Sequence, residues 1–343
     1  MNHELYIKRC IELAQNAKGY TSPNPMVGSV IVHNEQIIGE GWHHAPGQPH
    51  AEVNAINSVV EKSKLEESTI YVSLEPCAHF GRTPPCSDLI IENMIPKVVI
   101  GCRDPFEQVN GRGIEKLKAA GIEVIEGILE NECLDLNKAF FTFHTKKRPY
   151  IILKWAQTGD GFMDISRKEN EKGIKWITQP ETKTLVHQWR AEVDAILAGK
   201  YTVLNDNPSL TVREVGGKNP LRLVLDSKGE ITPDYSIFNE EAQTVVFVDR
   251  NINSTNSNHY PIDYSNSPLE QVMDYCYQNQ IQSVLVEGGA HTLQSFIDEG
   301  LWDEARVLTG VGTFENGLQA PGLNFAPIST FSFGKDIVNI YRP

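Results

Sequence analysis

The chain has 343 residues, more than one typical domain, and 40% of them are hydrophobic, so two packed domains are expected. Its formal net charge of −13 at pH 7 excludes a broad surface for polyanions, so we expect no nucleic-acid partner. No targeting segment and no apolar run of the roughly 20 residues that span a bilayer are visible, and the six cysteines are too sparse for a disulfide framework. These features predict a cytoplasmic chain without a membrane partner.

The first half alternates helical and strand patterns. Apolar residues recur at helical spacing over 4–18, and a stretch with two prolines, 21–25, ends that helix. Further helices are predicted over 50–60, 88–93 and 113–120, and strands over 27–32, 37–41, 69–74, 97–101 and 122–125. This alternation predicts a three-layer α/β domain with a mixed sheet.

A short basic stretch that ends in a proline, 145–149, predicts a domain boundary. It divides the chain into 1–145 and 149–343. In the second part, strands are predicted over 150–155, 195–198, 222–226, 244–248, 283–286 and 305–309, helices over 182–191 and 269–278, and a surface loop over 251–267. The second domain is therefore also expected to be α/β.

Three short motifs in the first hundred residues combine metal ligands with an acid. His50 is followed by Glu52, then Cys77 comes after a Glu-Pro pair, and Cys86 comes after two prolines. One histidine and two cysteines can supply three ligands to a tetrahedral zinc and leave the fourth position for water. The order H-x-E, P-C and a second cysteine is that of zinc deaminases, whose glutamate moves protons. The pattern predicts hydrolytic loss of an amine from a heterocycle.

A structural zinc site is the alternative interpretation. It would need a fourth protein ligand, for which His43, His44 and His79 are candidates. The loop between the two cysteines is longer than the C-x-x-C spacing and adds His79 and Arg82. These two residues either belong to a solvated loop or contact a phosphate-bearing substrate, for which arginine is well suited.

The second half has weaker signals. It contains no G-x-G-x-x-G after a strand. A predicted strand over 283–287 is followed by Gly288 and Gly289 and then by an amphipathic helix. This turn is either an anion-binding site at a helix N-terminus or an ordinary strand-to-helix turn. The polar segment 202–213 is either a pocket-lining loop or a surface connection.

The motifs of the first half, together with Pro23-Asn24-Pro25-Met26-Val27-Gly28, resemble the RibD family, the bifunctional deaminase/reductases of riboflavin biosynthesis. The resemblance implies a cytidine-deaminase-like three-layer α/β/α fold with one zinc ion at His50, Cys77 and Cys86 and with Glu52 as the catalytic proton carrier. The implied substrate is a small molecule, 2,5-diamino-6-(5-phosphoribosylamino)pyrimidin-4(3H)-one, which is deaminated at C2. The implied substrate contacts are Asn24, His43, His79 and Arg82.

Motifs of the second half resemble the reductase domain of the same family: Lys154, Asp160-Gly161, Trp176-Ile177-Thr178, Arg190, 202–213, Asp226-Ser227 and Glu287-Gly288-Gly289. The resemblance implies a dihydrofolate-reductase-like α/β fold that uses NADPH to reduce the ribosyl side chain, giving 5-amino-6-(5-phosphoribitylamino)uracil. The implied cofactor contacts are Ala156, Trp176, Thr202, Asp206, Ser227, Gly289, Ala290, His291, Thr292, Leu293, Gln294 and Ser295. The implied substrate contacts are Lys154, Arg190, Leu210, Arg213 and Glu287, with the two arginines holding the phosphate. The family also suggests a homo-oligomer, a dimer or higher.

The chain departs from the family pattern in the second half. The segment 162–175 is longer and more charged, Ile174 stands where a serine is typical, and the sequence after Thr313 matches poorly. One competing hypothesis is therefore a deaminase whose second domain is a degenerate binding or dimerisation module. Another is a nucleic-acid base deaminase, which the acidic charge and the lack of an aromatic and basic stripe oppose.

Overall fold

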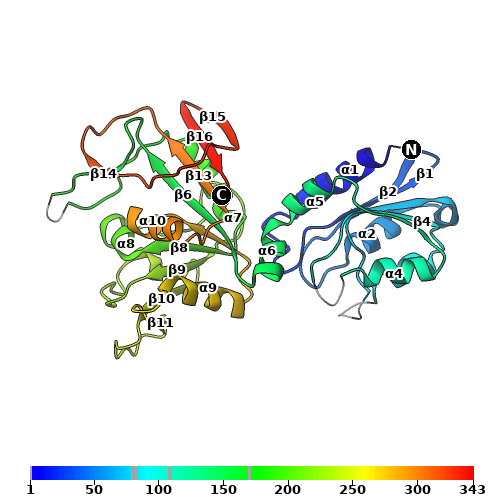
Figure 1. Cartoon of the computed structure of the whole chain (residues 1–343), viewed down its shortest axis with the longest axis horizontal. Helices are drawn as coiled ribbons and strands as arrows, with labels where there is room; N and C mark the ends of the chain where they lie inside the picture. Colours follow the sequence, from blue (N-terminus) through cyan, green and yellow to red (C-terminus); the bar gives the residue numbers. More distant parts are fainter. Residues whose placement is uncertain (1, 79, 81–83, 107–109, 169–170) are drawn as a thin grey trace. The chain divides into compact units, whose positions relative to one another are not determined.

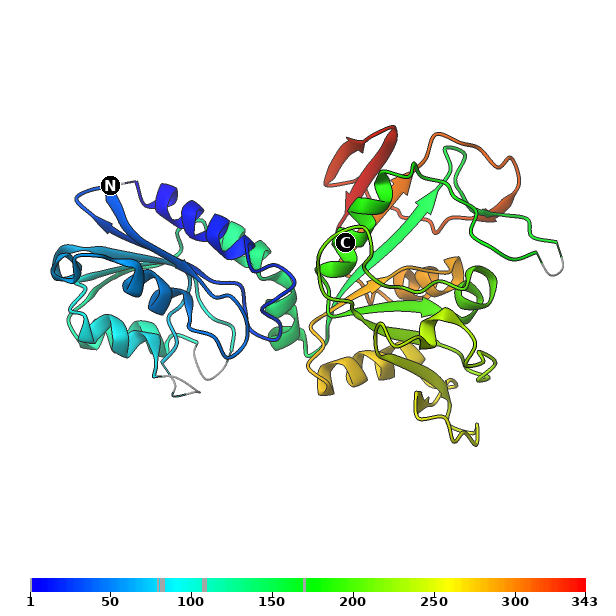
Figure 2. The same ribbon diagram turned by 180° about the vertical axis from the view of Figure 1, so that it is seen from behind.

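The structure is a computed structural model that describes residues 2–78, 80, 84–106, 110–168 and 171–343. The chain forms two compact units, Met1–Lys147 and Arg148–Pro343, drawn from two sides in Figures 1 and 2. Among the helices of the described residues, none has both the length and the apolar character that a membrane crossing requires.

The N-terminal unit contains a five-stranded mixed sheet in the order β2-β1-β3-β4-β5. Its strands are β1 (Gly28–His33), β2 (Gln36–Trp42), β3 (Thr69–Leu74), β4 (Lys97–Cys102) and β5 (Glu123–Ile125). β1 runs antiparallel to both β2 and β3, whereas β3, β4 and β5 are parallel. The predicted mixed sheet is confirmed.

Helices cover both faces of this sheet. They are α1 (His3–Gln15), α2 (Ala51–Ser58), α3 (Cys86–Glu92), α4 (Arg112–Ala119), α5 (Glu130–Leu136) and α6 (Lys138–Lys146), with a 3₁₀ turn at Lys62–Glu67. Because side chains alternate along a strand, Ile70 and Val98 pack with α2, α3 and α4, while Tyr71 and Val99 pack with α1 and α5 on the other face. Figure 1 shows α1 and α5 on one side of the sheet and α2 and α4 on the other. The predicted three-layer arrangement is confirmed.

Two helices before the domain boundary, α5 and α6, were not predicted. The sequence of α6 is rich in aromatic residues, which are modest helix formers. Tertiary contacts support this region: the side-chain amide of Asn137, next to α6, accepts a hydrogen bond from Met26 N and donates one to Met26 O, both at 2.8 Å. A contact between residues so distant in the chain leaves no periodic signal in the sequence.

The C-terminal unit contains a nine-stranded sheet in the order β11-β10-β9-β8-β12-β6-β13-β16-β15. Its strands are β6 (Tyr150–Gln157), β8 (Ala195–Gly199), β9 (Leu221–Leu225), β10 (Thr244–Asp249), β11 (His259–Ile262), β12 (Ser283–Val286), β13 (Glu304–Thr309), β15 (Ser329–Phe333) and β16 (Asp336–Tyr341). The strands from β11 to β13 are parallel, and β16 and β15 add antiparallel pairs at the edge next to β13. A separate pair joins β7 (Phe162–Ile165) to β14 (Gly317–Gln319).

The central parallel strands β8 and β12 are buried on both faces, as expected for a parallel sheet, whereas the edge strand β15 is largely exposed. The helices are α7 (Thr182–Ala191), α8 (Lys200–Asp206), α9 (Pro268–Gln278) and α10 (Ala290–Asp298), with a 3₁₀ turn at Ser236–Phe238. On β8, Leu197 packs in the core with α9 and α10, whereas Ile196 packs in the opposite core with Val203 of α8. The α/β class predicted for this half is confirmed.

Two predictions for this half were wrong. The segment 202–213 is not a loop throughout, because its first five residues complete α8. The segment 251–267 is not only a loop, because it contains β11, which pairs in parallel with β10. β11 lies at the edge of the sheet and is mostly polar or partly exposed, so it lacks the apolar alternation by which a strand is predicted.

Candidate active sites

Three metal-ligating side chains meet beyond the carboxyl end of β3, the central strand of the N-terminal sheet. The nearest ligand atoms of His50, Cys77 and Cys86 lie within 4.8 Å of one another. The Nδ1 atom of His50 lies 3.3 Å from Sγ of Cys86 and 3.6 Å from Sγ of Cys77. A tetrahedral zinc with bonds of ~2.0–2.3 Å places its ligand atoms roughly 3.3–3.8 Å apart. The donor set and its spacing therefore fit zinc.

Local structure explains why these three side chains converge. His50 is the N-cap of α2, and Cys86 is the first residue of α3. Cys77 follows the end of β3, and its Sγ accepts a hydrogen bond from the backbone N–H of Cys86 at 3.3 Å. The partial positive charge at the start of a helix favours thiolates there. A hydrogen bond with the side chain of Cys86, and next the one with His50, lower the pKa of the Cys77 thiol against the effect of burial.

Glu52 lies on the first turn of α2, two residues after His50, and its side chain is buried. Burial raises the pKa of this carboxyl group to about 7, and the neighbouring His50 opposes the rise. A carboxyl group with a pKa near neutrality can both accept and return a proton, as general acid–base catalysis requires.

A neutral histidine lies beside the metal ligands. His43 is buried, and burial lowers its pKa. Its Nδ1 lies 3.1 Å from the carbonyl oxygen of Pro49, and its Nε2 lies 3.0 Å from Nδ2 of Asn24. A ring that donates from Nδ1 and accepts at Nε2 satisfies both contacts. The His43 ring also meets that of His50 edge-on at 5.4 Å, so the predicted substrate contacts Asn24 and His43 adjoin the metal cluster.

The candidates for a fourth zinc ligand divide into two groups. His44 stacks on Trp42, with ring centroids 4.5 Å apart, and neither His43 nor His44 belongs to the ligand cluster that the described residues form. His79, as well as the predicted substrate contact Arg82, lies outside the described residues. Three described ligands are the number that leaves an open coordination position in catalytic zinc sites.

Glu75 is a buried acidic residue of this region to which sequence reasoning gave no role. Its carboxylate is buried and accepts backbone hydrogen bonds from Asp104, Gly111, Gly113 and Ile114 at 2.9–3.4 Å. It thus ties the start of α4 to the segment that carries Cys77. A Cβ atom at Gly113 would lie 2.0 Å from the carbonyl oxygen of Pro76, so this approach requires glycine.

The C-terminal unit contains a cavity of about 700 Å³ beside the carboxyl ends of β8, β9 and β12. Ligand pockets are typically ~300–1,000 Å³, and open α/β sheets bind ligands at this edge. The Gly289 turn leads into α10, whose first N–H groups suit phosphate. A Cβ atom at Gly199 would lie 2.4 Å from Oγ1 of Thr292, so a larger residue at this position of β8 would displace the Thr292 hydroxyl group of α10.

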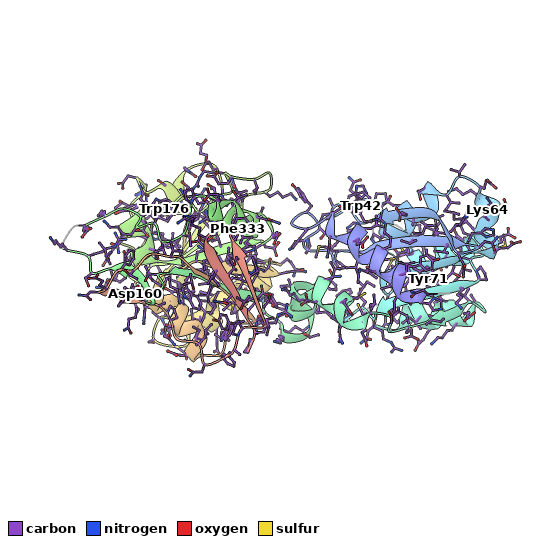
Figure 3. The ribbon with its side chains drawn as sticks, turned by 90° about the horizontal axis from the view of Figure 1, so that it is seen from above. Trp42, Lys64, Tyr71, Asp160, Trp176 and Phe333 are labelled. Atoms are coloured by element: carbon purple, nitrogen blue, oxygen red, sulfur yellow. The ribbon has the colours of Figure 1, made fainter. Side chains whose placement is uncertain are left out.

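The cavity brings together many of the predicted cofactor contacts. Its walls include Thr202, Asp206, Ser227, Gly289, Ala290, His291, Thr292 and Ser295, and also the predicted substrate contact Glu287. Trp176 is 59% exposed and lies under the ammonium group of Lys183, which is 3.7 Å from its ring centroid; Figure 3 labels this tryptophan. Ala156 lies on β6, and Gln294 faces solvent and donates to Asp298. The side chain of Leu293 packs in the hydrophobic core.

A buried cluster of charges adjoins this cavity. Nε and Nη2 of Arg190 lie 2.6 and 2.8 Å from the two carboxylate oxygens of Glu287, and Nζ of Lys154 lies 3.6 Å from Oε2. Burial alone would raise the pKa of Glu287, but Arg190 and Lys154 outweigh it and lower that pKa to about 2. Nη1 of Arg190 donates to the carbonyl oxygen of Thr211 at 3.1 Å.

The other two predicted substrate contacts differ in their exposure. Arg213 is exposed, and its backbone N–H donates to Nδ1 of the buried His187 at 2.9 Å. Leu210 is buried in the hydrophobic core. Of the two arginines assigned to the phosphate, Arg213 is the exposed one, whereas Arg190 makes a bidentate ion pair inside the protein.

Two lysines of the cavity wall were missed by sequence reasoning. Lys200 begins α8, and Lys228 follows the predicted contact Ser227 after β9. Nζ of Lys200 lies 2.7 Å from Oε2 of Glu230. The polar turn 226–229 after a strand could have indicated Lys228, whereas Lys200 required knowledge of α8.

Two family models match the chain. Residues 1–102 match the cytidine and deoxycytidylate deaminase zinc-binding region, and residues 149–312 match the RibD C-terminal domain. The predicted fold classes of the two halves are thereby confirmed.

Relatives match along nearly the whole chain. The riboflavin biosynthesis protein RibD of Aquifex aeolicus is 40% identical over 94% of this chain and 91% of its own length. The protein of the same name from Escherichia coli is 36% identical over 94% and 92%. The crystal structure of a diaminohydroxyphosphoribosylaminopyrimidine deaminase/5-amino-6-(5-phosphoribosylamino)uracil reductase from Thermotoga maritima has a TM-score of 0.89 at 38% identity, covering 99% of this chain and 98% of that one. A structure of Acinetobacter baumannii RibD has a TM-score of 0.88 at 32% identity with the same coverage. The deaminase and reductase halves of this chain, and the identity along its length, make it a member of the RibD family.

Proposed function

We propose that this chain catalyses two consecutive steps of riboflavin biosynthesis. The first is hydrolytic deamination of 2,5-diamino-6-(5-phosphoribosylamino)pyrimidin-4(3H)-one at C2, and the second is NADPH-dependent reduction of the ribosyl side chain to give 5-amino-6-(5-phosphoribitylamino)uracil. The observation that carries the proposal is the zinc-ligand cluster of His50, Cys77 and Cys86 with Glu52 beside it, in one chain with a cavity of about 700 Å³ at the carboxyl ends of a parallel sheet. We assign the deamination to residues 1–145 and the reduction to 149–343.

In the deaminase site, Glu52 moves the protons. Zinc, when it is held by the three ligands, supplies an acidified water for attack on the ring carbon. The Glu52 carboxylate would accept the two protons of this water in turn, first on attack and then from the hydroxyl group on the ring carbon, and pass one to the ring nitrogen and one to the leaving amine. Asn24 and His43 hydrogen-bond to each other beside the zinc ligands, and this position supports our assignment of both residues to orienting the pyrimidine. We assign His79 and Arg82 to the phosphoribosyl part of the substrate.

In the reductase site, the protein binds and orients the two reactants. NADPH, when bound, supplies the hydride, so no protein nucleophile is needed. The proposed contacts at Thr202, Asp206, Ser227 and 289–295, together with Ala156 and Trp176, would hold it. The basic residues Lys200 and Lys228 in the cavity wall support binding of a phosphate-rich cofactor.

The substrate of the reductase would occupy the region around the buried charge cluster. Lys154 and Glu287 present an ammonium group and a carboxylate that can hold sugar hydroxyl groups. Arg213 is exposed and suits the 5′-phosphate. Arg190 stabilises the same region by its ion pair with Glu287 and its hydrogen bond to the carbonyl oxygen of Thr211. Leu210 belongs to the segment between α8 and Arg213 and is assigned as a further substrate contact.

A coupled assay tests the proposal. Zinc-loaded protein is given the diamino substrate, and product masses are followed with and without NADPH. Without NADPH only the deaminated intermediate should accumulate, and with NADPH the reduced product should form. Glu52→Gln should retain zinc yet lose deamination, with a fall in kcat of about 10²–10⁴-fold, and should still reduce supplied intermediate. A protein that deaminates but never oxidises NADPH would instead have a degenerate second domain.

We also propose that the enzyme is a cytoplasmic homo-oligomer, a dimer or higher. None of the six cysteines is paired in a disulfide, which supports a reducing compartment. The β15–β16 hairpin at the sheet edge exposes Ile328, Phe331 and Ile337, which supports burial of this edge against another subunit. Light scattering after size-exclusion chromatography measures the mass, and a monomer at micromolar concentration would contradict the assembly.

A further inference from the structure

One wall of the reductase cavity carries two carboxylates. Asp164 comes from β7 and Asp206 from the last turn of α8, and both line the cavity. A nicotinamide dinucleotide brings several negative phosphate charges to such a cavity. Like charges that are brought together in a partly dehydrated site repel one another, so these two carboxylates need a counter-charge.

Arg167 supplies that counter-charge. Its Nε lies 2.5 Å from Oδ2 of Asp164, and its Nη2 lies 2.8 Å from Oδ1 of Asp206. Only 14% of its side chain is exposed, and it is not among the residues that line the cavity. The guanidinium group therefore lies behind the two carboxylates, where its planar fork of donors can engage both at once.

The same side chain organises the backbone of this wall. Nη1 of Arg167 donates to the carbonyl oxygens of Glu171 at 3.3 Å and Gly173 at 3.0 Å. The N–H of Gly173 in turn donates to the carbonyl oxygen of Asn205 at 2.8 Å, next to Asp206. On the other side, Asp164 is paired across to Leu318 of β14. One arginine thus links β7 and the end of α8, which both line the cavity, to the backbone that precedes Trp176.

We propose that Arg167 is a positioning residue of the cofactor site, which offsets part of the negative charge of the Asp164–Asp206 carboxylate pair and holds Asp206 in place for the cofactor. Because Oδ1 of Asp206 is engaged by Arg167, Oδ2 remains for a hydroxyl group of the ligand. The inference rests on the proposed NADPH-dependent reduction. It also gives a role to the charged segment 162–175 by which this chain departs from the family pattern.

Equilibrium binding of NADPH to the zinc-loaded full chain, followed by cofactor fluorescence without substrate, tests the proposal. Arg167→Met keeps the length of the side chain and removes its charge, and we expect the Kd for NADPH to rise about tenfold or more. Arg167→Lys retains the charge without the fork and should lie between. Asp164→Asn combined with Arg167→Met removes one repelling carboxylate and should recover most of the lost affinity.

The Kd for NADH distinguishes the loss of a counter-charge from general damage to the cavity. It lacks the extra phosphate of NADPH and therefore carries less negative charge, so Arg167→Met should weaken NADH binding less than NADPH binding. Arg250→Met is the matched control, because it removes an exposed arginine that is paired with Asp263 in the same domain and does not line the cavity. Deaminase turnover and thermal unfolding verify that each variant is folded.

The outcomes separate this proposal from the proposed function. If the unaltered protein binds neither NADPH nor NADH, the reductase assignment fails and the proposal fails with it. If the unaltered protein binds NADPH and Arg167→Met matches it within about twofold, only the role of Arg167 is refuted. Equal losses for NADPH and NADH, without recovery in the double variant, would likewise refute charge neutralisation.

Discussion

Glu75 offers a sharp test of how the zinc-binding segment is supported. Its Oε2 accepts backbone hydrogen bonds from Gly111 at 2.9 Å and from Asp104 at 3.4 Å, and its Oε1 accepts those from Gly113 at 3.0 Å and Ile114 at 3.4 Å. In Glu75→Gln the amide retains one oxygen, but its NH₂ group must face the other pair of donors. Two buried backbone N–H groups then lose their acceptor whichever way the amide is turned.

The expected cost follows from this count. Each buried N–H group without a partner costs about 1–3 kcal/mol, so the variant should lose roughly 2–6 kcal/mol of unfolding free energy. For a domain of this size 1 kcal/mol corresponds to about 3 °C, so the unfolding temperature of the deaminase domain should fall by roughly 6–18 °C. Because Cys77 lies two residues away, we also expect zinc affinity to fall by about one to two orders of magnitude.

Calorimetry of the full chain after zinc removal measures the stability effect, with the reductase transition as an internal reference. Competition with a chelator measures zinc affinity. Glu66→Gln is the control, because it removes the same charge from an exposed position of the same domain. If Glu75→Gln unfolds within about 2 °C of that control, the four hydrogen bonds contribute little and the reasoning is wrong.

Three further predictions concern the reductase domain. Lys228→Ala should raise the KM for NADPH about tenfold and the KM for NADH less, because Lys228 contributes positive charge to the cavity wall. Steady-state kinetics measures both constants, and an equal rise in the two would contradict this role of Lys228. Arg213→Ala should impair reduction of supplied intermediate and leave deamination unchanged, which the coupled assay checks; full retention of reduction would remove Arg213 from the phosphate site. The pKa of Glu287 is about 2 in the folded protein, against ~4.3 in the unfolded chain. The ionised carboxylate therefore stabilises the folded domain by about 3 kcal/mol above pH ~4, and this contribution is lost as the pH falls towards 2. Urea unfolding of Glu287→Gln should therefore show a deficit at pH 7 that shrinks below pH ~4, and a deficit independent of pH would refute the assignment.

The deaminase site could be predicted largely from local sequence, because its parts are short motifs at element boundaries. His50 and Glu52 are two residues apart, so the start of one helix fixes their relative geometry. Cys77 and Cys86 flank a single loop and follow prolines, and this limits where their side chains can lie. That Asn24 hydrogen-bonds to His43 was not predictable from spacing, because the pairing depends on how the first loop returns to the sheet.

The reductase site was less accessible to sequence reasoning because it is assembled from separate strand ends. Thr202 and Asp206 were assigned to a loop, yet they lie on α8, whose seven residues are too few for a clear periodic pattern. Glu287 and Arg190 are 97 residues apart, and only the parallel pairing of the strands brings such residues together. The family resemblance therefore supplied these contacts, while the residues alone left the pocket and the surface connection equally open.

Glu75 and Arg167 show why supporting residues are harder to predict than reacting ones. A metal ligand is recognised by its own chemistry, since histidine and cysteine in that spacing have few other uses. A supporting charge is recognised only by its partners, and those of Glu75 are backbone N–H groups, which every residue except proline possesses. The partners of Arg167 are two aspartates and two carbonyl oxygens, which a charged loop would contain by chance. Both roles depend on burial and on the direction of particular bonds, and these become visible only when the elements are placed in space.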